Sequence, residues 1–182
     1  LLKWQKAMEK EGKKAVFGFE GYVESVISGE KKRYHGLFLA KNEVGLKNIY
    51  ELTSRAYDNF YRKPHVSIDL LTKYHEGLIF TSACVGGELS RTILENSYED
   101  AKAVALFYKN LFNDDFYIEV QNHNFYDEQK VNPVLYQIAS ELNIKVVAAN
   151  DSHFLNPEDK EEHRILLALS YGKKLDEVEG FE

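Results

Sequence analysis

The chain has 182 residues, of which 44% are hydrophobic, 13% aromatic and 29% charged, and its formal net charge is −6. This length fits one domain with a sizeable core, and the aromatic content excludes a disordered chain. No apolar run approaches the ~18–20 residues that span a membrane. The single cysteine excludes an internal disulfide and favours a reducing, cytoplasmic setting. The acidic balance argues against a strong nucleic-acid clamp and suits the binding of metal cations.

The first half of the chain predicts helices alternating with short apolar strands. Polar residues with short side chains stand where helices should begin, and glycines stand in the expected turns. In chain order, we expect a helix over 3–12, a strand that starts at 15–17 and leads to Glu20, a strand over 35–40, a helix capped by Asn42, a short helix over 68–74 capped by Ser67, and a buried strand over 78–80.

The second half repeats this alternation more clearly. Ser97 and Asp100 resemble a capping box, and Pro is favoured at the first position of a helix. The strand over 145–149 is continuously apolar, which predicts burial on both faces. The expected elements are a helix after Ser97, a strand over 116–120, a helix opened by Asn132-Pro133, the strand over 145–149, and a last helix opened by Asn156-Pro157 with Ile165, Leu166 and Leu169 on its apolar side.

Alternating strands and helices favour a mainly parallel α/β sheet with right-handed crossovers, which is either an open sheet or a closed barrel. Several predicted strands end in side chains that can bind metal. In a barrel these ends converge on one face, whereas in an open sheet they spread along an edge. We therefore expect a barrel, and the side chains concerned are Glu20, Cys84, His123, Asp151 and His153.

The strongest local motif is Asn150-Asp151-Ser152-His153, just past a predicted strand. Residues two apart in an extended segment point to the same side, so Asp151 and His153 can reach one ion. A carboxylate with a neutral imidazole suits Zn, Mn or Fe. The alternative is an ordinary loop in which both residues act as helix caps.

Four further candidates have plain structural alternatives. Cys84, before Gly86-Gly87, is a metal ligand, a small buried hydrophobe, or a nucleophile that would need a histidine base. Glu20 needs a metal or partner if it faces the core, but can face solvent. His35 opens a strand and is a ligand or a surface residue. His123 follows a strand and is a ligand, a phosphate contact or a loop residue.

In the basic aromatic stretch Phe60-Tyr61-Arg62-Lys63-Pro64, Arg62 and Lys63 with Tyr61 could contact phosphate, or they could form a solvated turn before Pro64. We expect His65, in a basic loop, to carry no chemistry. His75 and His163 are predicted to be solvated.

Taken together, these residues resemble the PHP (polymerase and histidinol phosphatase) domain, in the branch found in bacterial replicative DNA polymerase III α subunits. The resemblance extends from Trp4 to about Asp176. Its carriers are Gly18-Phe19-Glu20, the segment from Tyr34 to Asn42 with Gly45-Leu46-Lys47-Asn48, Phe60 to Pro64, Gly77-Leu78-Ile79, Ser82 to Glu88, and Asn150 to Leu155 with Glu158-Asp159.

This resemblance implies a distorted (β/α)7 barrel with up to three divalent ions, of Zn, Mn or Fe, at the strand ends. It implies five metal ligands, namely Glu20, His35, Cys84, Asp151 and His153, with His123 as a neighbour of the site. The HxH and TDH-like motifs of the family are absent. We therefore expect a fragment whose barrel lacks its first strands, with an incomplete PHP domain over 1–172 and a linker over 173–182.

The resemblance implies a metal-dependent phosphoesterase, with 3′–5′ exonuclease proofreading as one form, inside a DNA-directed DNA polymerase. This fragment alone is expected to be inactive. The alternatives are a non-catalytic scaffold that supports the polymerase or binds a proofreading subunit, and a stand-alone PHP phosphatase. The implied partners are DNA, through the full-length polymerase, and other replisome subunits, with no membrane partner and a cytoplasmic location.

Overall fold

The computed structural model describes residues 1–27, 29, 31–58, 60 and 62–178. Tyr61 of the basic aromatic stretch, and residues 179–182 of the expected linker, lie outside the described residues. The chain divides into two compact units, Leu1–Ala148 and Ala149–Glu182. Each unit is therefore described by itself.

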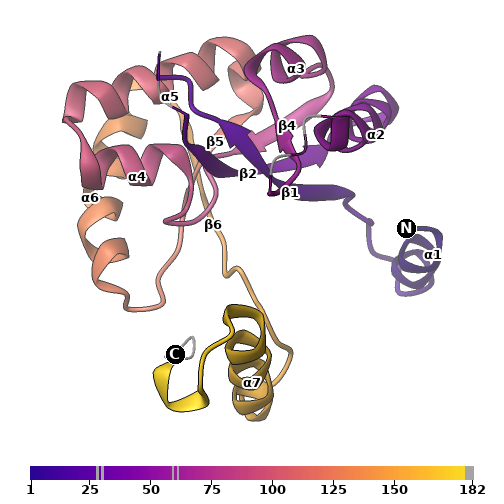
Figure 1. Cartoon of the computed structure of the whole chain (residues 1–182). Helices are drawn as coiled ribbons and strands as arrows, with labels where there is room; N and C mark the ends of the chain where they lie inside the picture. The colour runs from indigo at the N-terminus through magenta and orange to yellow at the C-terminus, as the bar shows by residue number, and fades with distance from the viewer. Residues whose placement is uncertain (28, 30, 59, 61, 179–182) are drawn as a thin grey trace. The chain divides into compact units, whose positions relative to one another are not determined.

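The first unit is built on a six-stranded mixed sheet with the order β3-β1-β2-β4-β5-β6 (Figure 1). The pairs β1–β3, β4–β5 and β5–β6 are parallel, whereas β2 is antiparallel to both β1 and β4. The described strands do not close on themselves, and their arrangement is compatible with a partial barrel. The strands are β1 (Gly18–Glu24), β2 (Arg33–Ala40), β3 (His65–Val66), β4 (Leu78–Thr81), β5 (Phe116–Val120) and β6 (Lys145–Ala148).

Helices join the strands from β2 onward and cover the sheet (Figure 1). Helix α2 packs against β1 to β4, whereas α5 and α6 pack against β4 to β6. Helix α1 buries none of its residues. The helices of this unit are α1 (Leu2–Lys10), α2 (Glu43–Asp58), α3 (Ile68–Lys73), α4 (Glu88–Glu95), α5 (Tyr98–Phe112) and α6 (Tyr126–Leu142), with a 3₁₀ turn, η1, over Asn113–Asp115.

An aromatic cluster forms the centre of the core between β2, β4, β5 and α5. The Phe80 ring lies 5.0 Å from both the Phe38 and Phe112 rings and 4.8 Å from the Tyr108 ring. Phe38 and Phe80 are almost fully buried, and burial of each such ring stabilises the fold by about 1.5–3 kcal/mol. The sheet that carries the site residues therefore rests on a well-packed layer.

Three predicted helix caps are confirmed. The Asn42 side chain accepts a hydrogen bond from the Gly45 amide at 3.0 Å, and Ser67 accepts one from Leu70 at 3.3 Å. Ser97 and Asp100 form both bonds of a capping box. These side chains satisfy amide groups that the first turn of a helix leaves without an internal partner.

Three predictions about local structure are wrong. Helix α6 begins at Tyr126, so Pro133 lies inside it and has no amide to donate to the carbonyl of Gln129. Strand β6 is largely exposed, because among the described strands only β5 pairs with it. His65 lies in the short strand β3 and is buried, where its Nε2 is 3.1 Å from Glu24.

The second unit contains the 3₁₀ turns η2 (Pro157–Asp159) and η3 (Leu175–Glu177) on either side of helix α7 (Lys160–Tyr171). Asn156 and Asp159 form a capping box at the start of η2. The predicted apolar side of α7 is exposed, with exposed fractions of 44% for Ile165 and 74% for Leu169. None of the described helices is long and apolar enough to cross a bilayer.

Candidate metal centre

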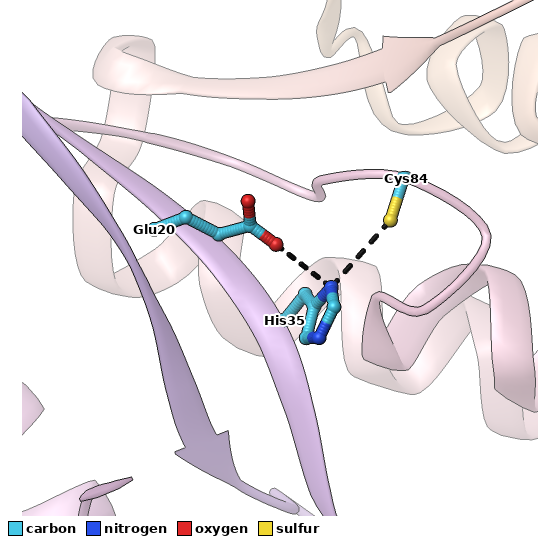
Figure 2. Close-up of side chains that lie close together, drawn as sticks. All are labelled: Glu20, His35 and Cys84. Carbon is cyan, nitrogen blue, oxygen red and sulfur yellow. Dashed lines mark hydrogen bonds and ion pairs between the residues drawn. The ribbon is translucent and has the colours of Figure 1, made fainter. Parts of the chain in front are cut away.

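Three of the predicted ligands converge in the first unit (Figure 2). Glu20 lies on β1, His35 on the neighbouring β2, and Cys84 in the loop after β4. The Nδ1 atom of His35 is 2.7 Å from Oε1 of Glu20 and 3.6 Å from Sγ of Cys84. One donor atom from each residue lies within 4.8 Å of the other two, which makes this a group able to hold a metal ion.

The pairing register of β1 and β2 places Glu20 and His35 together. His35 lies directly opposite Tyr22, and Glu20 is two residues before Tyr22 on the same face of β1. Such diagonal neighbours across an antiparallel pair are within reach of long side chains. The contact between Glu20 and His35 therefore depends on strand register.

The backbone of the loop after β4 fixes Cys84 over His35. The His35 amide donates to the Gly86 carbonyl at 3.0 Å, and the Gly86 amide donates to Sγ of Cys84 at 3.4 Å. Gly87 closes the turn, since a Cβ at this position would lie 1.9 Å from the Ser82 carbonyl oxygen. The double glycine thus permits a close turn that carries the thiol to the imidazole.

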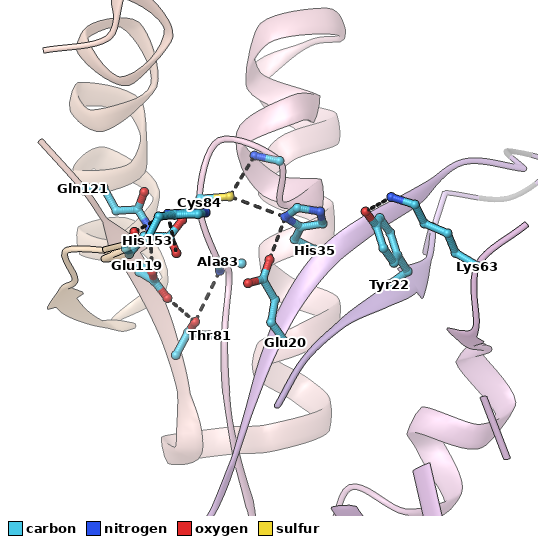
Figure 3. A network of polar contacts seen from close by, with 12 residues as sticks. Glu20, Tyr22, His35, Lys63, Thr81, Ala83, Cys84, Glu119, Gln121 and His153 are labelled. Carbon is cyan, nitrogen blue, oxygen red and sulfur yellow. Dashed lines mark hydrogen bonds and ion pairs between the residues drawn. The ribbon is translucent and has the colours of Figure 1, made fainter. Parts of the chain in front are cut away.

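A buried polar network supports this loop from below (Figure 3). Glu119, on β5, accepts hydrogen bonds from the Thr81 hydroxyl at 2.5 Å and from the Gln121 side chain at 2.9 Å. The Ala83 amide donates to Thr81 at 3.3 Å, and the Ser82 hydroxyl accepts from the Glu119 amide at 2.9 Å. Because these groups satisfy one another in the interior, they hold the start of the loop in one conformation.

The electrostatics of the group favour bound cations. Hydrogen bonding to Cys84 and then to Glu20 raises the pKa of His35 to about 10 against the smaller opposing effect of burial. A hydrogen bond from Lys63 lowers the pKa of Tyr22, whose ring edge faces His35 at 5.0 Å. The same acceptor groups that stabilise a proton on His35 would stabilise a divalent ion in its place.

The donor set fits a transition metal or zinc. A carboxylate oxygen, an imidazole nitrogen and a thiol sulfur are the three protein ligands that zinc uses, and catalytic zinc sites retain an open position beside three such ligands. The imidazole also suits iron and the carboxylate manganese. Glu20, His35 and Cys84 would hold the ion from the first unit.

Asp151 and His153 lie in the second unit. Asp151 has a left-handed backbone with φ of 42°, and Nδ1 of His153 donates to its carbonyl oxygen at 2.7 Å. The two side chains approach within 4.0 Å, and both are partly exposed. Their membership of the same metal centre stays a prediction.

His123 is oriented by a buried carboxylate. Its Nδ1 lies 2.7 Å from Oε1 of Glu128, and its amide donates to Oε2 of Glu128 at 2.6 Å. Glu128 is 2% exposed. A carboxylate behind an imidazole is a common arrangement around metal-binding histidines, which keeps His123 a candidate neighbour of the site.

Sequence reasoning missed Tyr22 beside the group and did not place Lys63 there. Tyr22 projects from the same face of β1 as Glu20, and Lys63 donates to its hydroxyl at 2.5 Å (Figure 3). The two-residue spacing of Glu20 and Tyr22 was a usable signal. The approach of Lys63 has no local signal, because it depends on the parallel pairing of β3 with β1.

Comparison with known proteins places the chain in a family. A family model described as the PHP domain matches residues 1–123. The chain belongs to the PHP domain family. It is similar to DNA polymerase III subunit alpha of Borreliella burgdorferi (43% identity, 97% of this chain, 16% of the relative), of Treponema pallidum (38%, 94%, 16%) and of Thermus aquaticus (36%, 92%, 14%). The chain thus spans 14–16% of the length of these relatives.

Proposed function

We propose that this chain is the PHP part of a bacterial replicative DNA polymerase α subunit and forms a metal-dependent phosphoesterase site. The convergence of Glu20, His35 and Cys84 within 4.8 Å carries the proposal. Asp151 and His153 would complete the ligand set, with up to three ions of Zn, Mn or Fe. DNA, other replisome subunits and a cytoplasmic location follow from the similarity to replicative polymerases.

The substrate in this proposal is a phosphodiester at the 3′ end of DNA. Divalent ions, when bound, lower the pKa of water and neutralise charge on the phosphoryl group. The water oxygen bonds to phosphorus, the bond from phosphorus to the 3′ oxygen breaks, and that oxygen takes a proton. Glu20, His35 and Cys84 would hold the ions for this hydrolysis, which would release a nucleoside monophosphate.

The test uses protein expressed from the full reading frame that encodes this chain. We expect elemental analysis to find two or three ions per chain, and a 3′-labelled primer to be shortened with manganese or zinc. His35→Ala should lower the metal content and reduce the cleavage rate about 100-fold, since it removes a proposed ligand. His75→Ala, at the end of α3, is the matched control and should change neither.

The outcome that overturns the proposal is equally specific. Cleavage and metal content that persist in His35→Ala, or in Asp151→Asn combined with His153→Ala, would place any nuclease elsewhere.

A non-catalytic scaffold is the second candidate function. It is favoured by the exposed apolar side chains of α7, because such surfaces mark protein contacts. If the domain serves only as a scaffold, the wild-type protein will hold no ions and will leave the primer intact. Ile165→Lys with Leu169→Lys would then release a bound replisome subunit, which a pull-down measures against Glu162→Lys.

A further inference from the structure

A cavity of about 330 Å³ adjoins the candidate metal centre in the first unit. Its volume falls within the ~300–1,000 Å³ of small-molecule sites. Residues of β1, the end of α2 and the segment leading into β3 line it, and Glu20 belongs both to this lining and to the metal group. A ligand in the cavity would therefore lie next to the reacting centre.

One wall of the cavity carries a fixed positive charge. The Nζ atom of Lys63 is 2.5 Å from the Tyr22 hydroxyl and 4.4 Å from the centre of the Tyr22 ring. The phenol holds the flexible lysine side chain in place, and an ammonium group has three donors, of which Tyr22 takes one. Lys63 can thus present N–H groups to an anion that enters the cavity.

Aromatic rings also line the cavity. Tyr22 and Phe19 line it from β1, and Tyr57 lines it from α2. Tyr57 is 65% exposed and stacks on Phe60, which is 59% exposed, with ring centres 6.5 Å apart. Exposed, stacked aromatic rings beside a lysine are the combination that binds single-stranded nucleic acid, with rings for the base and the cation for the phosphate.

We propose that this cavity binds the terminal nucleotide of a DNA strand, with Lys63 on its phosphate and Tyr57 against its base. The inference rests on the proposed phosphoesterase function for the identity of the substrate. Lys63 and Tyr57 are positioning residues here, whereas the metal ligands carry the hydrolysis. The arrangement gives the site a preference for nucleotides over inorganic phosphate or simple phosphomonoesters.

Binding of thymidine monophosphate to the full chain, measured by calorimetry with excess chelator, tests the proposal independently of the metal site. We expect the nucleotide to bind more tightly than either thymidine or inorganic phosphate. Lys63→Gln should weaken nucleotide binding about tenfold and leave thymidine binding unchanged, because only a charge-assisted hydrogen bond is lost. Tyr57→Leu should weaken nucleotide and thymidine binding alike, by about fivefold or more.

Lys130→Gln is the matched control, since Lys130 lies 4.1 Å from the centre of the Tyr126 ring on α6 and lines no part of this cavity. Equal effects of Lys63→Gln and Lys130→Gln would overturn the proposal. So would inorganic phosphate binding as tightly as the nucleotide, or a chain with native circular dichroism that binds no nucleotide. Failure of the phosphoesterase proposal would show instead as a loss of metal binding, which this titration does not measure.

Discussion

The Glu20–His35–Cys84 group and the Asp151-Ser152-His153 segment offer the same kinds of metal ligand but hold them differently. In the first, strand register and the backbone of the loop after β4 fix donor atoms that are far apart in sequence. In the second, Asp151 and His153 are near in sequence, partly exposed and joined by one local hydrogen bond. The comparison teaches that a sheet can pre-organise ligands, whereas a short motif only supplies them.

The largest expected effect breaks the loop of the first group. Gly87→Ala would place a Cβ 1.9 Å from the Ser82 carbonyl oxygen, so the turn must open. We expect a loss of about 3 kcal/mol in the free energy of unfolding, measured by urea denaturation, together with weaker zinc binding. Gly172→Ala in the second unit meets no atom within 4 Å and should cost only the left-handed strain of about 1 kcal/mol. Equal losses of stability in Gly87→Ala and Gly172→Ala would contradict the conclusion that only glycine fits the close turn at position 87.

The next effect concerns a buried carboxylate at the start of α4. Glu88 accepts hydrogen bonds from the Ser25 hydroxyl and the Val26 amide, each at 2.7 Å, and from the Tyr108 hydroxyl at 2.7 Å. Glu88→Ala leaves these donors unpaired and should lower the free energy of unfolding by about 2 kcal/mol.

The control for this variant is Glu95→Ala on the same helix, which removes exposed ion pairs and should cost less than about 1 kcal/mol in the same urea titration. If the two variants unfolded at the same urea concentration, the buried network would have no special role in the first unit.

A smaller effect depends on pH. In chelator, the raised pKa of His35, about 10, means that its contacts stabilise the fold fully below pH 6.5 and lose that contribution as pH rises through 10. The difference in free energy of unfolding between wild type and His35→Gln should shrink by about 1 kcal/mol between pH 6.5 and 10. The effect is small because the His35–Glu20 pair is half exposed and screened by solvent. Thermal melts from pH 6 to 10 measure it. When both proteins also carry Cys84→Ala, this stability difference should change less with pH. A stability difference that grows with pH would contradict the raised pKa of His35.

The smallest effect lies in the second unit. Asp159 accepts from the Asn156 amide at 3.1 Å in the capping box before α7. Asp159→Ala should lower the local stability of α7 by about 0.5 kcal/mol, seen as faster amide hydrogen exchange in Lys160–Tyr171. Glu158→Ala, in the same turn, is the control and should leave exchange unchanged. Equal exchange rates in Asp159→Ala and Glu158→Ala would contradict a role for this capping box.

Much of the fold was predictable because its signals are local. The caps at Asn42, Ser67 and Ser97 and the strand at 116–120 follow from residue type and periodicity over a few positions. The start of α6 was missed because Asn132-Pro133 also fits a helix beginning. Strand β3 was missed because two residues carry no periodicity.

The site was predictable in its residues but not in its assembly. Glu20, His35 and Cys84 were candidates from their chemistry and from the resemblance, while their contact depends on the register of β1 with β2 and on the turn at Gly87. Lys63 was visible only as part of a basic stretch. Its place beside Tyr22 comes from the neighbouring strand.

The sequence by itself determined the α/β alternation, most helix starts, the family resemblance and the set of metal-capable side chains, because each depends on neighbours within a few positions. Only the tertiary structure decided that Glu20, His35 and Cys84 share one point, that the strand at 145–148 is an exposed edge, and that a cavity with Lys63 adjoins Glu20. Those features arise from pairing between strands distant in the chain, whose register a local pattern does not encode.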